Sequence, residues 1–215
     1  MRDYKMKDRR PIGEVYRKMG YGFVDVLVEK NVDPNHISYL SMVFATIAAT
    51  LLYFSSHVAW FLIIAPFFCF LRLYCNMVDG MVAVKADKCS AKGEVINEAP
   101  DRISDIIIFG GVAVSELTST TLWLWVTIGS LFVAYLGVLG KSVGASRQFG
   151  GIMSKQWRMF AVAGGCWAAY GVLFFSWPYS VTILDIIAIF ILVGLVQTAL
   201  LRLYRLFKEL RSDQR

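Results

Sequence analysis

Two neighbouring stretches of sequence decide how this chain folds. Residues 72–83 read RLYCNMVDGMVA, and residues 93–105 read GEVINEAPDRISD. Each places charged and amide side chains within or beside a long apolar segment. Ionisable groups are costly inside a membrane-spanning helix and usually face the protein interior or a cavity. The two stretches therefore predict two neighbouring helices whose polar faces turn toward each other.

The polar residues of the first stretch share one helical face. Arg72, Asn76, Asp79 and Ala83 follow the spacing i, i+4, i+7, i+11, which makes one stripe along a helix. The stripe carries a cation, an amide and a carboxylate, and it ends in a small residue.

The second stretch also places oxygen-bearing side chains along one helical face. Asn97, Asp101 and Asp105 lie four residues apart, and Glu98 adjoins them. Carboxylate and amide oxygens suit Mg²⁺, Mn²⁺ or Ca²⁺, and no His or Cys belongs to either stripe to favour zinc. Together the two stripes predict a site for a hard divalent cation.

The alternative is a structural network of ion pairs. In that case Arg72 would pair with Asp79, and Arg102 would pair with Asp105 or Glu98. A functional site is favoured, because ionisable residues within membrane spans usually serve function.

The composition beyond these stretches excludes a soluble globular domain. Apolar residues make up 57% of the 215 residues and charged residues 18%, against about 45–50% and about 25% in soluble domains. The same values exclude disordered, collagen-like and disulfide-rich secreted proteins. A multi-pass membrane protein remains.

Hydropathy predicts an all-α integral membrane protein with six transmembrane helices, since one crossing needs about 20 apolar residues. The stretches are about Ile37–Ser55, Trp60–Val84, Ile103–Leu117 (extended backward through Gly93–Arg102), Thr121–Gly140, Met159–Trp177 and Val181–Leu203. The expected organisation is a cytoplasmic arm over residues 1–35, a six-helix domain over residues 36–204 and a basic tail over residues 205–215.

The basic residues predict the orientation. All 22 Lys and Arg lie within Arg2–Lys30, Arg72–Arg102, Lys141–Arg158 and Arg202–Arg215. The three remaining connections carry none, so six spans place every basic segment on one side, which should be cytoplasmic. Both termini are then cytoplasmic. The net charge of +6 belongs to one membrane face, and nucleic-acid binding is not expected because no recognisable module is present.

Local patterns add three expectations. Apolar residues recur at helical spacing over Glu14–Lys30, which predicts an amphipathic helix along the membrane interface. Asn35, after Pro34, is expected to cap the first span. The pairs Gly110–Gly111 and Gly164–Gly165 predict close approach between helices.

Read forward, the two stretches give Asn76-x2-Asp79-Gly80-x2-Ala83-Val84-x8-Gly93-x3-Asn97-x3-Asp101. This spacing resembles the signature of the CDP-alcohol phosphotransferase family, D-x2-D-G-x2-A-R-x8-G-x3-D-x3-D, without an insertion. Residues 32–38, VDPNHIS, also look like the start of the first helix in many members. The resemblance covers the spans and the junction between the second and third.

The resemblance implies a six-helix enzyme of phospholipid biosynthesis. The family transfers a phospho-alcohol group from a CDP-alcohol, such as CDP-diacylglycerol, to an acceptor hydroxyl and releases CMP. Its four aspartates hold two divalent ions, and the last aspartate is the proposed general base. A homodimer, and for a bacterial member an inner-membrane location with the site facing the cytoplasm, are implied as well.

Carried over by position, Asp79 matches the second aspartate, a metal ligand. Asp101 matches the fourth, a metal ligand and the catalytic base. Gly80, Ala83 and Gly93 match the small positions where the nucleotide approaches the helices.

The chain departs from the signature at Asn76, Asn97 and Val84, which replace the first aspartate, the third aspartate and the arginine. It looks like a branch of the family with Asn at both aspartate positions. An Asn oxygen still ligates a hard cation, but each replacement removes a negative charge. Either Glu98 or Asp105 compensates, or one Mg²⁺ or Mn²⁺ binds rather than two.

Other basic residues are available in place of the missing arginine. Arg72 lies on the polar stripe and is expected to contact the diphosphate of the nucleotide. Arg147, Lys155 and Arg158 form a basic cluster near the fifth span, which suits a phosphate-bearing acceptor or, equally, the orientation signal alone.

Two other functions remain open. One is a six-span transporter or ion-binding membrane protein, and the other is a non-catalytic protein of the same fold. Transporters often contain internal repeats, and the two halves of this chain show none.

Overall fold

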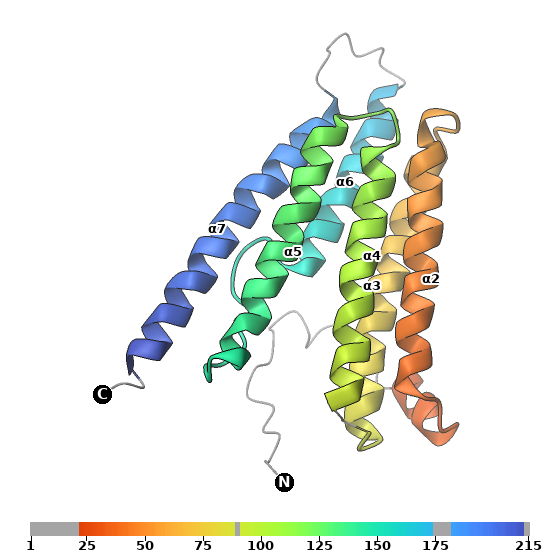
Figure 1. The fold of residues 1–215 in the computed structure, drawn as a ribbon. Coiled ribbons are helices and arrows are strands. Elements are labelled where there is room, and N and C mark those ends of the chain that lie inside the picture. The colour runs from red at the N-terminus through yellow and green to blue at the C-terminus, as the bar shows by residue number, and fades with distance from the viewer. Residues whose placement is uncertain (1–21, 89–90, 174–181, 213–215) are drawn as a thin grey trace.

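The computed structural model describes residues 22–88, 91–173 and 182–212, and over these residues the chain is a bundle of helices (Figure 1). The bounds are α2 Pro34–Tyr53, α3 Phe61–Lys85, α4 Ala91–Ala113, α5 Thr120–Ser142, α6 Lys155–Leu173 and α7 Ile183–Ser212, with a short 3-10 turn, η1, at Phe54–Ser56.

Each of these long helices contains most of one apolar stretch of the sequence. The third stretch does extend backward, because α4 begins at Ala91. The ends of two stretches, at Trp177 and Val181, lie outside the described residues. So does most of the expected interfacial helix, of which residues 22–29 are helical.

The helices form two groups that meet along the middle of the bundle. In one group α2 packs against both α3 and α4, and in the other α7 packs against both α5 and α6. Contacts between α4 and α5 and between α3 and α6 join the groups. Figure 1 shows α2 at one side of the bundle and α7 at the other.

The outer surface is that of a membrane protein. Within the described ranges, four segments are long and apolar enough to cross a membrane: Pro34–Ser56, Phe61–Lys85, Thr120–Ser142 and Ile183–Arg211. Large apolar side chains are exposed along them, including Phe67, Trp125, Phe190 and Leu200. A water-soluble monomer rarely exposes so much apolar surface. The chain is therefore a multi-pass integral membrane protein, while the sixfold crossing and the sidedness of the termini stay predictions.

The start of α2 differs from the expectation in one residue. The cap is Asp33, whose side chain accepts a hydrogen bond from the backbone N–H of Asn35 at 2.9 Å. Asn35 already lies inside the helix, so the predicted Asn35 cap is wrong. Proline is favoured at the first helical position, and Pro34 therefore shifts the cap to the residue before it.

One glycine of each predicted pair lies against a neighbouring helix. A Cβ on Gly111 would lie 2.6 Å from the carbonyl oxygen of Ala49 in α2, and a Cβ on Gly165 would lie 2.8 Å from Ile187 in α7. A Cβ on Gly110 or Gly164 would meet nothing within 4 Å. Adjacent residues point about 100° apart around a helix, so only one of each pair can face the partner.

Candidate active site

The polar faces of α3 and α4 meet inside the bundle. Arg72, in the middle of α3, is fully buried, and Asp101 and Asp105 of α4 are 6% and 1% exposed. Arg72 lies about 20 Å along the helix axis from the end of α3 at Lys85, at ~1.5 Å per residue. The polar cluster therefore reaches deeper than the edge of the bundle.

Arg72 joins the two helices. Its Nη2 donates to the backbone carbonyl of Asp101 at 2.9 Å and lies 3.3 Å from Asp101 Oδ1 and 3.0 Å from Asp105 Oδ1. The alternative pairing of Arg72 with Asp79 is not what the structure shows. Arg72 fixes the position of two acidic residues one helical turn apart.

A third helix contributes two cations to the same cluster. Lys155, the first residue of α6, places its Nζ 2.5 Å from Asp101 Oδ2 and also donates to Asn76 Oδ1. One turn later, Arg158 donates from Nη2 to Asp105 Oδ2 at 2.8 Å. The Asp105 carboxylate is thus held between two guanidinium groups.

The two asparagines of the motif bind each other. Asn76 Nδ2 donates to Asn97 Oδ1 at 3.2 Å, which links α3 to α4 at a second point. The positions of the first and third aspartates of the family signature, here Asn76 and Asn97, therefore lie side by side.

Asp79 contacts a different helix. Its Oδ2 accepts a hydrogen bond from Ser38 Oγ in α2 at 2.5 Å, while its buried Oδ1 has no hydrogen-bond partner among the described residues. Ser38 was noticed in the sequence only as part of the helix start. Its spacing to Asp79 is 41 residues, so no local pattern could reveal this contact.

Glu98 belongs to an outer group of ion pairs. It pairs with Arg102 of its own helix and with Arg147 from the segment before α6. Arg147 also lies over the ring of Phe149 at 4.9 Å and near Glu94. These pairs connect α4 to the α5–α6 connection.

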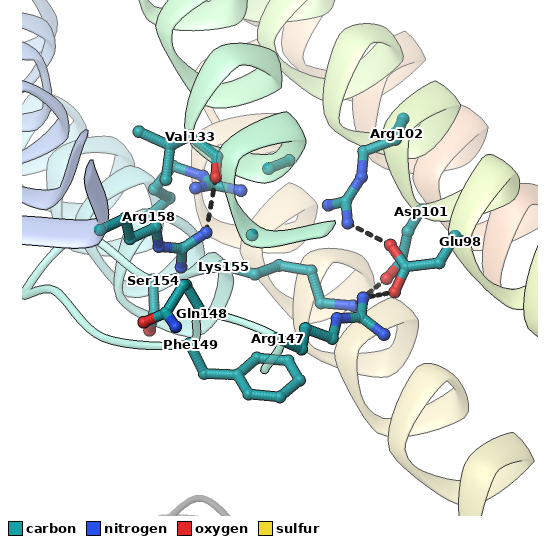
Figure 2. A pocket seen from close by; sticks show the side chains of 13 residues that line it. Glu98, Asp101, Arg102, Val133, Arg147, Gln148, Phe149, Ser154, Lys155 and Arg158 are labelled. Carbon is teal, nitrogen blue, oxygen red and sulfur yellow. Dashed lines mark hydrogen bonds and ion pairs between the residues drawn. The ribbon is translucent and has the colours of Figure 1, made fainter. Parts of the chain in front are cut away.

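A cavity of about 60 Å³ opens between α4, α5 and the start of α6. Figure 2 shows the Lys155 side chain extending across it toward Asp101, with Arg147 and Phe149 along one side. Arg158 and Arg202 also line it. Ligand pockets usually measure about 300–1,000 Å³, so this space suits a small anionic group and not a whole nucleotide.

Arg202 is a cavity residue that the sequence did not single out. It donates to the backbone carbonyls of Val133 at 2.5 Å and Gly150 at 3.0 Å. Its position near the end of the last apolar stretch looked like an orientation signal, and only the folding of α7 against α5 brings it here.

The small residues of the motif leave space along α3. A Cβ on Gly80 would meet nothing within 4 Å, and Ala83, on the same helix, is half-buried. Gly93, near the start of α4, is also half-buried. The protein therefore offers a free approach to the backbone of α3 beside Asp79.

The chain resembles known proteins in sequence and in fold. No protein-family model matches the chain. The inner membrane protein YnbA of Escherichia coli strain K12 is 24% identical over 151 residues, which are 70% of this chain and 74% of YnbA.

The solved structures of phosphatidylinositol phosphate synthase, PgsA1, from Mycobacterium tuberculosis are more extensive matches. The structure with CDP-DAG bound has a TM-score of 0.68 at 20% identity, over 93% of this chain and 94% of PgsA1. The structure with manganese and citrate has a TM-score of 0.70 at 20% identity, over 86% and 88%. The chain has the PgsA1 fold.

The oxygen atoms present fit one hard cation better than two. Asp79 Oδ1 is buried and lacks a hydrogen-bond partner among the described residues, which suits a metal ligand. The oxygens of Asn76 and Asp101 instead bind Lys155. In the described part of the chain, no three His, Cys, Asp or Glu side chains lie close enough together to hold an ion.

Proposed function

We propose that this protein transfers a phosphatidyl group from CDP-diacylglycerol, or a related CDP-alcohol, to the hydroxyl of a polar acceptor and releases CMP. The contact that carries the proposal is the meeting of Asp101 with Lys155 at the cavity. The shared fold with PgsA1, which has been solved with CDP-DAG bound, supports the same substrate class.

Asp101 is the proposed general base. The acceptor hydroxyl gives its proton to Asp101 Oδ2 and forms a new bond to the phosphorus that carries the alcohol. The bond from that phosphorus to the bridging oxygen breaks, and CMP leaves with the electron pair. Because Oδ2 binds Lys155 at 2.5 Å, the lysine must move aside, or share the oxygen, before the hydroxyl can bind.

Arg72 is a positioning residue in this proposal. It is fully buried and holds both the backbone and the side chain of Asp101. The expected contact between Arg72 and the diphosphate stays a prediction. Positioning is a large part of catalysis in phosphoryl transfer.

The cations around the cavity suit a phosphate-bearing acceptor. Lys155, Arg158, Arg147 and Arg202 all line it, and guanidinium groups bind phosphate in a bidentate manner. All of them are paired with acidic side chains or backbone carbonyls, but the Arg158 side chain is 2% exposed whereas that of Arg147 is 18% exposed, so Arg147 is the better candidate for direct contact.

Asp79, with its unpartnered Oδ1, is the residue that would hold a Mg²⁺ or Mn²⁺ ion, with Asn76, Asn97 and Asp101 nearby as further oxygen donors. When bound, the ion would offset the charge of the diphosphate and stabilise the leaving CMP. Ser38 keeps the Asp79 carboxylate oriented from α2.

The basic residues favour a cytoplasmic position for the site, and the likeness to an inner membrane protein of Escherichia coli supports a bacterial inner membrane. A lipid substrate would enter sideways from the inner leaflet. Assembly as a homodimer is part of the same proposal.

The main test is to incubate the purified protein with CDP-diacylglycerol, Mn²⁺ and a panel of polar alcohols and alcohol phosphates, and to follow CMP. Acceptor-dependent CMP release is expected. Asp185→Asn is a matched control, because Asp185 is a buried carboxylate near the start of α7, on another part of the bundle. Transport of a solute by sealed vesicles without CMP release would instead favour the transporter.

Gly80→Ala tests the approach of the nucleotide. Nothing in the described structure would contact the added methyl group, and alanine is the better helix former. Stability should therefore be kept or slightly raised, while the KM for the CDP-alcohol should rise. An unchanged KM would place the nucleotide elsewhere.

A further inference from the structure

The ammonium group of Lys155, from α6, binds side chains of both α3 and α4. Asn76 on α3 and Asp101 on α4 each direct an oxygen at the same atom, the Nζ of Lys155. The sequence predicts a divalent ion between these two stripes. The structure instead places an ammonium group against two of the expected ligand atoms.

The pairing of Asn76 with Asn97 explains why a singly charged ammonium group, rather than a divalent ion, is enough between α3 and α4. Two carboxylates facing each other at positions 76 and 97 would repel and would need a multivalent cation between them. Two amides can pair directly, as Asn76 Nδ2 and Asn97 Oδ1 do at 3.2 Å. That pairing leaves Asn76 Oδ1 as an acceptor, and Lys155 donates to it.

The buried cluster already holds more positive than negative charges without a metal ion. Arg72, Arg158, Arg202 and the largely buried Lys155 supply four positive charges. Asp79, Asp101 and Asp105 supply three negative charges. Buried charge is tolerated only where it is compensated. Two divalent ions would add four positive charges, whereas the diphosphate of a CDP-alcohol, being a diester, brings about two negative charges and so balances one divalent ion.

We propose that the Lys155 ammonium group takes the place of one divalent ion between α3 and α4, so that the site binds a single Mg²⁺ or Mn²⁺ at Asp79, together with the diphosphate. This inference rests on the proposed function for the nature of the nucleotide. It assigns Lys155 a role other than binding the phosphate of the acceptor.

The test counts bound ions and does not depend on turnover. Purified protein is titrated with Mn²⁺ in the presence of saturating CDP, and free Mn²⁺ is followed by electron paramagnetic resonance. One ion per chain is expected for the unchanged protein. A count of two, or a count of zero, would overturn the proposal without any variant having to fold.

Matched variants test whether Lys155 limits the number of bound ions. Asn76→Asp with Asn97→Asp restores the four carboxylates but keeps Lys155, and the count should stay at one. Adding Lys155→Ala to this pair should raise the count to two, whereas adding Lys208→Ala, an exposed lysine of α7, should not. A count of two in the double variant with Lys155 present would contradict the assignment.

The outcome is separable from that of the proposed function. If the ion counts are as expected but no acceptor supports CMP release, the transfer reaction is wrong and the role of Lys155 stands. If CMP is released and the unchanged protein binds two ions, the reaction stands and the role of Lys155 is wrong.

Discussion

Two buried carboxylates in this bundle have opposite surroundings. Asp185, near the start of α7, accepts four hydrogen bonds from neutral donors: Thr118 Oγ1 and Ser119 N–H at 2.7 Å on Oδ1, and Thr182 N–H and Oγ1 at 3.1 Å on Oδ2. Asp101, by contrast, is held by two cations from two other helices.

The difference supports a structural role for Asp185 and the proposed functional role for Asp101. The donors around Asp185 come from its own helix start and from the α4–α5 connection, and both of its oxygens are satisfied. Around Asp101 and Asp79, polar atoms remain without hydrogen-bond partners in the described structure, among them Asp79 Oδ1 and Arg72 Nη1. Such buried unsatisfied groups are rare, and they support the proposal that these two aspartates serve function.

Asp101→Asn should have the largest effect of any single substitution. Removal of the proposed base should lower the rate of CMP release at least about 100-fold, while Asp185→Asn should stay within about twofold of the unchanged protein. The initial rate of CMP formation is the measurement. Equal losses in both variants would remove the distinction between the two carboxylates.

Asp79→Ala should lose metal-dependent activity, and Ser38→Ala should lose less. The first removes the proposed ligand, whereas the second removes only the hydrogen bond that orients it, for which a loss of about 10–100-fold in metal affinity is typical. Mn²⁺ titrations of the rate give both values. If Asp79→Ala kept full turnover with added Mg²⁺, the ligand assignment would be wrong.

Arg158→Met should destabilise the fold by about 3 kcal/mol, because it leaves Asp105 buried with Arg72 alone. Thermal unfolding in detergent, with the exposed Arg211→Met as control, measures this loss. Adding Asp105→Asn to Arg158→Met should recover part of the stability, since the buried charge is then removed. No recovery would indicate that packing, rather than charge, is responsible.

Asp185→Asn should cost about 2 kcal/mol of stability, the smallest of these effects. The new amide would direct N–H groups toward the donors of Thr182 or Thr118. Unfolding should therefore occur at lower temperature, with the rate of CMP release preserved. A variant of unchanged stability would show that the hydrogen bonds of Asp185 are replaceable by water.

Periodicity and hydropathy were sufficient to place the helices and to predict that Arg72 and Asn76 face α4, but not that Asp79 contacts Ser38 of α2. Residues four apart share a helical face, so the polar residues within each stretch lie on one side of their helix. Because α3 and α4 follow each other in the chain, Asn76 on one helix can meet Asn97 on the other. Asp101 follows Asn97 by four residues, so the same spacing predicts that Asp101 also faces α3. The structure agrees, because Asp101 contacts Arg72 of α3.

Contacts between distant segments were not predictable from local patterns. Lys155 and Arg158 were recognised as a basic cluster, but their pairing with Asp101 and Asp105 depends on how α6 packs against α3. Ser38 was missed for the same reason. Of the expected interfacial helix, residues 22–29 lie in the described part of the chain and are helical.

The close contact between Gly111 and Ala49 has a consequence for the spacing of the two aspartates. Asp79 and Asp101 lie on α3 and α4, which touch each other far less than each touches α2. α2 packs against α4 at the Ala49–Gly111 contact and binds α3 through the hydrogen bond from Ser38 to Asp79. The position of α4, and with it that of Asp101, therefore depends on the absence of a side chain at Gly111, because any Cβ there would push α4 away from the backbone of α2.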